Sequence, residues 1–155
     1  MANNYVVFSE MLTDLTDEER QWLDEMTDEV RGPEKDEIPR IWAEYLQESE
    51  HTIDVDPDSL DYLGFGCKLD DDGFWMYSDE SANMEHVAYF VHRFLQRFRS
   101  DQYWSAEFAF TCDKLRCGEH GGGALFVTAT SIDWMSGYAW ICEQEKKFKA
   151  GGKPR

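Results

Sequence analysis

The sequence has no long apolar run and no recognisable export signal. No stretch of eighteen apolar residues occurs, which argues against a membrane-spanning helix. Residues 1–10 lack the basic start of a secretory signal peptide. We therefore expect a soluble, cytoplasmic protein with no membrane partner. The few cysteines, at positions 67, 112, 117 and 142, are then expected as free thiols.

Basic residues are scarce, above all in the first half of the chain. Fifteen Lys and Arg stand against 32 Asp and Glu, a net charge of −17. Residues 1–85 hold 25 acids and 5 bases, whereas residues 86–155 hold 7 acids and 10 bases. Such a field repels nucleic acid and attracts basic protein surfaces. The charge therefore predicts that the chain does not bind nucleic acid directly. It predicts as partner a basic protein that itself binds nucleic acid.

Apolar and aromatic residues are nevertheless abundant enough to build a core. They make up 42% and 15% of the 155 residues, which indicates a folded chain of single-domain size. We predict one domain over residues 1–155, with 150–155 as a flexible tail.

The order of periodic segments predicts an α+β fold. Alternating or continuous apolar runs predict strands at 4–8, 60–69, 74–77, 103–111 and 124–130. Helical spacing predicts helices at 14–29, at about 39–46, from residue 81 or 83 to 98, and at 131–148. Helices separated by hairpins favour an antiparallel sheet of about 4–5 strands, with about four helices packed mainly on one face.

Local signals refine this prediction. Thr16 and Glu19 form a capping-box pattern, and Asp70 to Gly73 is typical of a hairpin turn. The glycine-rich residues 112–123 are interpreted as a connection. His86 and His92 fall mostly off the apolar stripe of their helix and are expected to face solvent.

Acidic residues form the main candidate site. Half of the sixteen residues in 14–29 are acids, about one per 3 Å of helix, close to the ~3.4 Å charge spacing of one DNA strand. Two aspartate clusters extend the set. The predicted partner-binding residues are Asp14, Asp17, Glu18, Asp24, Glu25, Asp28, Glu29, Asp54, Asp56, Asp58, Asp70 and Asp71. The alternative is a solvated face that only keeps the protein soluble.

Two further functions are compatible with the sequence. Cys112, Cys117 and His120 are weak candidates for a zinc site or a thiol pair, which would make the protein a small metalloprotein or thiol enzyme. Their spacing does not match a zinc knuckle, so we predict no catalytic residue, no metal and no cofactor. Aromatics on both faces of the strands near 74–77 and 103–110 would suit a structural subunit that forms a homodimer.

The second half of the chain resembles a group of small acidic bacterial proteins. The resemblance rests on the residues from Asn83-Met-Glu-His-Val-Ala through Phe94-Leu to Gly121-Gly-Gly-Ala, with Val127-Thr-Ala and Trp134. It implies no activity. In size and charge alone, the chain is similar to the DNA-mimic inhibitors of phages and plasmids. We therefore expect a non-enzymatic inhibitor or decoy, such as an anti-defence protein, that occupies a basic nucleic-acid-binding surface.

Overall fold

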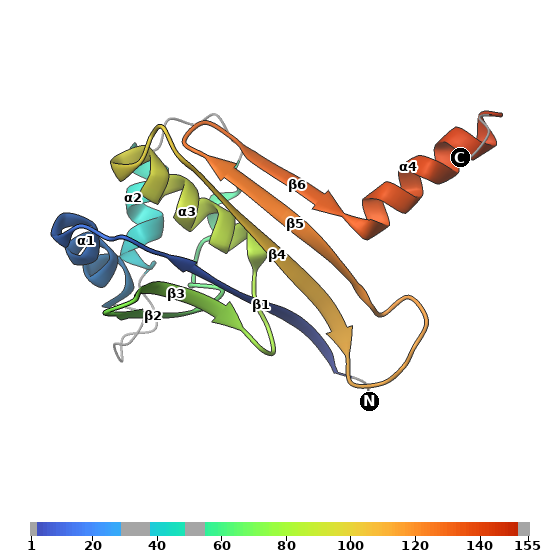
Figure 1. Ribbon diagram of the computed structural model, residues 1–155, viewed down its shortest axis with the longest axis horizontal. Coiled ribbons are helices and arrows are strands. Elements are labelled where there is room, and N and C mark those ends of the chain that lie inside the picture. The colour runs from blue at the N-terminus through green and yellow to red at the C-terminus, as the bar shows by residue number, and fades with distance from the viewer. Residues whose placement is uncertain (1–2, 29–37, 49–54, 152–155) are drawn as a thin grey trace.

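A computed structural model describes residues 3–28, 38–48 and 55–151. Its centre is a six-stranded sheet in the order β2-β3-β1-β4-β5-β6 (Figure 1), and every pair of neighbouring strands is antiparallel. The elements in chain order are β1 (Asn4–Leu12), α1 (Asp17–Asp28), α2 (Arg40–Glu48), a 3-10 helix (Pro57–Ser59), β2 (Gly66–Asp70), β3 (Gly73–Ser78), α3 (Met84–Phe98), β4 (Tyr103–Cys112), β5 (Gly121–Thr128), β6 (Ile132–Ser136) and α4 (Gly137–Lys149).

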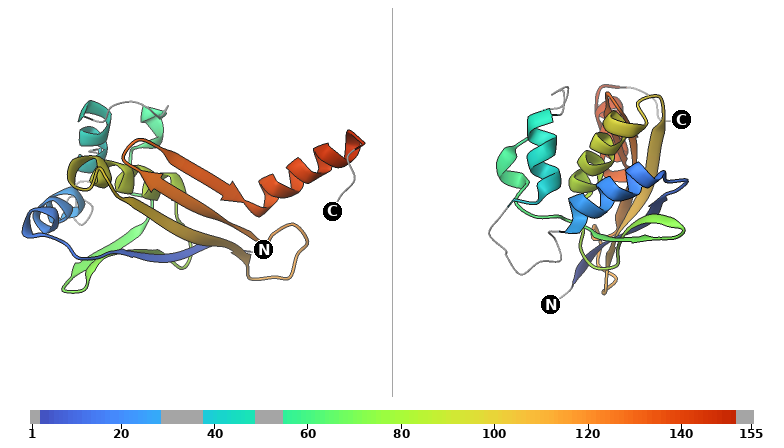
Figure 2. Two further views of the ribbon diagram at one scale, coloured as in Figure 1. Left: turned by 45° about the horizontal axis from the view of Figure 1, so that its top comes forward. Right: turned by 90° about the vertical axis from the view of Figure 1, so that its left-hand side faces the viewer.

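Helix α3 lies on the sheet and carries the core. Its spacing of apolar residues buries Val87, Phe90 and Phe94 completely, and the Phe90 ring stacks on Phe74 of β3 at 5.4 Å. Trp22 of α1 packs on the same helix, 5.8 Å from Phe90. Helix α2 lies on the side of α3 that faces away from the sheet (Figure 2). The helices thus form a two-deep cover over one half of the sheet.

The predicted α+β class and antiparallel sheet are confirmed, with one more strand than expected. Residues 132–136, predicted to begin the last helix, form β6 instead. The helix begins only at Gly137, where the Ser136 hydroxyl accepts a hydrogen bond from the Ala139 N–H at 3.1 Å. Alternating Ile132 and Trp134 pair with β5, and this period of two outweighs the helical pattern.

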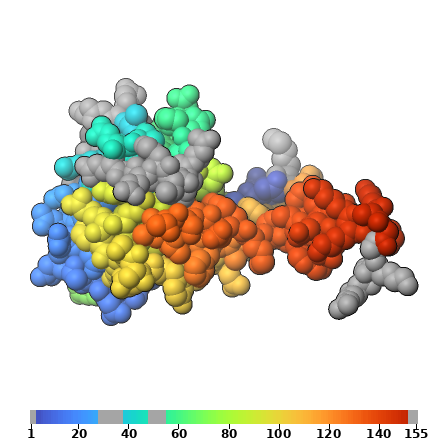
Figure 3. Space-filling view, turned by 90° about the horizontal axis from the view of Figure 1, so that it is seen from above, coloured from blue at the N-terminus to red at the C-terminus, as the bar shows by residue number. Residues whose placement is uncertain are grey.

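Helix α4 is the exception to the predicted packing of the helices mainly on one face. It continues from β6 without a loop and projects away from the body, as Figures 1 and 3 show, and none of its residues is buried. The predicted tail at 150–155 begins with Ala150, whose N–H closes α4 on the Lys146 carbonyl at 3.0 Å; residues 152–155 lie outside the described part.

Two local predictions are confirmed in detail. The Thr16 hydroxyl accepts from the Glu19 N–H at 3.1 Å and Glu19 accepts from the Thr16 N–H at 2.8 Å, so the capping box starts α1. The turn at Asp70–Gly73 joins β2 to β3 in register. The predicted first strand of this hairpin was too long, because β2 starts only at Gly66.

The two α3 histidines were predicted wrongly. His86 and His92 are both fully buried. The His86 ring accepts from the Gly64 N–H at 3.0 Å and donates to the Ser59 carbonyl at 2.8 Å. These bonds satisfy both ring nitrogens, so the side chain is buried without leaving a polar group unpaired. The His86 side chain therefore links Ser59 and Gly64, which precede β2, to helix α3.

Candidate functional site

The acidic surface consists of the outer side of α1 and the β2–β3 turn. At 100° per residue, Asp17, Glu18, Asp24 and Glu25 fall within about 120° of the helix circumference, opposite the buried Leu23 and Met26. All four are exposed. They span about 12 Å of helix as two adjacent pairs, 17/18 and 24/25, which lie about 9 Å apart along the axis. Four exposed carboxylates therefore share one face of α1.

An arginine joins the turn to the helix. The Arg20 guanidinium donates to the main-chain carbonyls of Asp70 at 2.8 Å and Asp71 at 3.2 Å. Because the guanidinium binds carbonyl oxygens, the two carboxylates stay available. One oxygen of Asp70 accepts the Asp72 N–H at 2.9 Å, which shapes the turn, while the Asp71 side chain is exposed.

The neighbouring arginines of α3 and its C-terminus are committed to internal ion pairs. Arg99 binds Glu19 at 2.8 Å, and Arg93 and Arg97 each bind Glu44 at 3.0 Å. Burial alone would raise the pKa of Glu19, but hydrogen bonds from Arg99 and Thr16 outweigh burial and lower that pKa. Glu19 is the one acid of residues 14–29 that is not in the predicted partner-binding set. It is buried in this ion pair and so has a structural role.

The remaining predicted acids are not all part of this surface. Asp14 is exposed and precedes α1 with a left-handed backbone, φ 56°. Asp56 and Asp58 are exposed at the start of the 3-10 helix, which lies on the far side of α2 from the β2–β3 turn in the right-hand view of Figure 2. The Asp58 N–H donates to the Asp56 carboxylate at 3.0 Å, so Asp56 caps this turn. Asp28 ends α1, and Glu29 and Asp54 lie outside the described residues.

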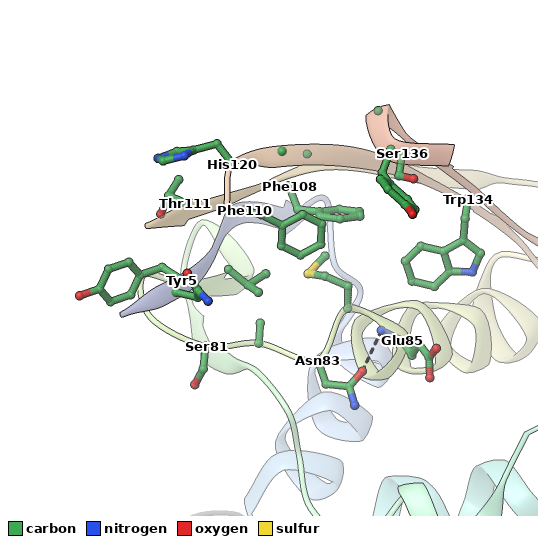
Figure 4. A pocket seen from close by; sticks show the side chains of 18 of the residues that line it. Tyr5, Ser81, Asn83, Glu85, Phe108, Phe110, Thr111, His120, Trp134 and Ser136 are labelled. Carbon is green, nitrogen blue, oxygen red and sulfur yellow. Dashed lines mark hydrogen bonds between the residues drawn. The ribbon is translucent and has the colours of Figure 1, made fainter. Parts of the chain in front are cut away.

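An apolar groove occupies the half of the sheet that the helices leave open. It has a volume of about 1670 Å³ and runs from the start of β1 and the end of β4 to the start of α4. Figure 4 shows Phe108, Phe110 and Trp134 pointing from the sheet toward the start of α3, where Asn83 caps the helix through the Glu85 N–H at 3.0 Å. Phe110 and Trp134 remain 41% and 46% exposed.

The glycine run forms part of this groove. It was interpreted as a connection, but β5 begins at Gly121 and pairs there with Phe110 of β4. A Cβ on Gly123 would lie 2.7 Å from the Phe108 ring, so only glycine lets that ring lie against the strand. The sequence signal was available: a glycine run next to aromatic strands also fits close approach of side chains to a backbone.

The candidate metal residues do not assemble into a site. Cys112 ends β4, Cys117 lies exposed in the following turn, and His120 is exposed just before β5. Across residues 3–28, 38–48 and 55–151, no group of three His, Cys, Asp or Glu side chains is placed to hold a metal ion. Within the same ranges, no helix is long and apolar enough to cross a membrane.

Sequence reasoning missed the apolar side chains of α4. Tyr138, Ile141 and Phe148 repeat at helical spacing on one side of the helix and are 79%, 52% and 64% exposed.

Comparison with known proteins adds no assignment, since no protein-family model, curated protein or solved structure matches the chain.

Proposed function

We propose that this protein is a non-enzymatic binding protein whose acidic surface occupies a basic, nucleic-acid-binding surface of a partner protein. One observation carries the proposal: Arg20 holds the aspartate turn beside the acidic side of α1 through carbonyl oxygens, so Asp71 and the four exposed acids of α1 form no ion pair within the described part of the chain. Concentrating like charges opposes folding, so the arrangement calls for a function outside the fold.

The position of the charges along α1 supports this interpretation. Acids in the first turn of a helix stabilise it, but Asp24 and Glu25 lie toward the C-terminal end, where negative charge is unfavourable and the last turn holds no base. We expect D24N/E25Q to raise the free energy of unfolding by about 0.3–1 kcal/mol. A helix selected only for stability would not carry these residues.

Competition with DNA tests the proposal. Bacterial proteins that a DNA column retains are eluted with the purified protein, and captured partners are then measured by titration at several salt concentrations. We expect elution by the native chain, competition with duplex DNA, and affinity that falls steeply as salt rises. The variant D17N/E18Q/D24N/E25Q should lose this activity.

A matched control separates the surface from net charge. The variant D101N/D113N/D133N/E143Q removes the same four negative charges from exposed positions in the second half of the chain. It should elute the same partners as the native chain. Equal loss in both variants would reduce the effect to bulk charge, and no loss in either would contradict the proposal.

A further inference from the structure

Helix α4 is too short and too exposed to stand alone. It has 13 residues, whereas isolated helices below about 12–15 residues are marginal in water. Besides the apolar side of Tyr138, Ile141 and Phe148, Trp140 is 60% exposed. A helix with such a face requires an apolar surface to pack against.

The same chain carries an apolar surface of suitable size. The groove of about 1670 Å³ exceeds the ~300–1,000 Å³ typical of small-molecule sites. Three turns of helix, ~10–12 Å wide and ~16 Å long, occupy roughly 1,300–1,800 Å³. The groove therefore matches a helix better than a small ligand.

Helix α4 is badly placed to fill its own groove. No loop separates β6 from Gly137, and the Ser136 cap fixes the direction in which the helix leaves the strand. Of α4, Gly137, Tyr138 and Ile141 line the groove. The helix continues away from the body of the molecule (Figure 3). The groove is thus open to another polypeptide.

We infer that two copies of the chain associate about a twofold axis, with α4 of each lying in the groove of the other. The charges agree with this arrangement: the groove lining includes Glu85 and Glu119 but no Lys or Arg, and the last turn of α4 carries Lys146, Lys147 and Lys149. A twofold contact of this kind satisfies both unpartnered surfaces at once.

The area is sufficient for a stable dimer. With ~150–250 Å² per aromatic side chain, the exposed 79% of Tyr138, 60% of Trp140 and 64% of Phe148 amount to roughly 400 Å² per helix. Two helices and two groove surfaces then bury about 1,600 Å², the size of a standard specific interface. The inference does not depend on the proposed function, because α4 and the groove share no residue with the acidic surface.

Mass measurement in solution tests the dimer. Sedimentation velocity of the full chain from about 1 to 100 µM should show twice the 18.1 kDa chain mass. The variant Y138S/I141S/F148S should raise the dimer dissociation constant by roughly tenfold or more for each anchor. The control A139S/E143S places two serines on the side of α4 opposite Tyr138, Ile141 and Phe148, leaves the three lysines unchanged and should remain dimeric.

A complementation experiment distinguishes the arrangement from simple misfolding. Gly121 has room for a side chain, since the nearest atom to its Cβ is on the Phe110 ring at 3.8 Å. G121F should fill the groove and leave α4 intact, whereas W140S/F148S should weaken α4 without changing any residue that lines the groove. Each variant alone should be a monomer. Mixed together, they should form a heterodimer through the one remaining helix and groove. A native chain that is monomeric at 100 µM, or a mixture that stays monomeric, would overturn the inference.

Discussion

The buried histidines should make the stability of this protein depend on pH near neutrality. The Tyr45 hydroxyl donates to Nδ1 of His92 at 2.8 Å, and Nε2 donates to the Ala129 carbonyl at 3.1 Å. His86 has the same pattern with Gly64 and Ser59. A carbonyl only accepts, so each ring carries a hydrogen on Nε2. The Gly64 N–H only donates, so Nδ1 of His86 holds no hydrogen and that ring is neutral. Burial disfavours the charged form of His92, and in the neutral form its Nδ1 accepts from the Tyr45 hydroxyl.

The direction of the effect follows from the pKa values. Burial lowers the pKa of His86 below 6.5, although the Ser59 hydrogen bond and the charges of Glu85 and Asp61 oppose this. Burial also lowers the pKa of His92, with Arg93 acting in the same direction and the Ala129 hydrogen bond opposing. Below pH 6.5, the unfolded chain therefore binds more protons at these two histidines than the native state does. The stabilisation is complete above pH 6.5 and is lost as pH falls toward the native pKa.

The size of the loss can be worked out for pH 5.5. One unit below the ordinary value, an unfolded histidine is about nine-tenths protonated, and each native ring that stays neutral costs up to about 1.4 kcal/mol. The two together cost up to about 2.8 kcal/mol relative to pH 7.5. Urea unfolding followed by tryptophan fluorescence at pH 7.5, 6.5 and 5.5 measures this change.

Variants isolate the two rings from the many carboxylates. H86Q/H92Q lowers stability at every pH, but the difference between native and variant should shrink as pH falls, since only the native chain loses its histidine contribution. Exposed His120 provides the control, and H120Q should keep the native pH dependence. A difference between native and H86Q/H92Q that is constant from pH 7.5 to 5.5 would refute the reasoning.

Two further predictions concern the packing of α1 and α3. F90A removes a fully buried ring between Phe74 and Trp22 and should lower the free energy of unfolding by about 3–5 kcal/mol, measured by urea titration; a loss below 1 kcal/mol would contradict the packing described. E19Q breaks the Arg99 ion pair and should destabilise more at pH 7 than at pH 3, because the lowered pKa of Glu19 confers stability that is complete above pH 4.5 and is lost as pH falls through the native pKa. Equal destabilisation at both pH values would refute a charge-based role.

Local rules predicted most of the fold. The capping box at Thr16 and Glu19, the turn at Asp70–Gly73 and the apolar stripe of α3 each rest on contacts between residues close in sequence. Such contacts are readable without knowledge of tertiary neighbours. The class of fold follows once these elements are ordered along the chain.

Tertiary context decided the points that were missed. His86 and His92 are buried because Ser59 and Ala129, 27 and 37 residues away, supply carbonyl acceptors. Gly121 belongs to β5 because β4 offers a pairing edge. In the candidate site, the sequence identified the acid-rich helix. It did not show which of the acids share a face, nor the Arg20 contact, nor that Asp56 and Asp58 lie apart from that surface.

The hydrogen bonds from Arg20 to the β2–β3 turn have a consequence for how this surface can evolve. A carbonyl oxygen is present in every amino acid, so these two bonds impose no requirement on the side chains at positions 70 and 71. Mutation can add, remove or reverse charge at Asp71 while the scaffold keeps its shape. Under the proposed function, such variation would let the acidic surface match a changed partner while the free energy of folding stays nearly constant.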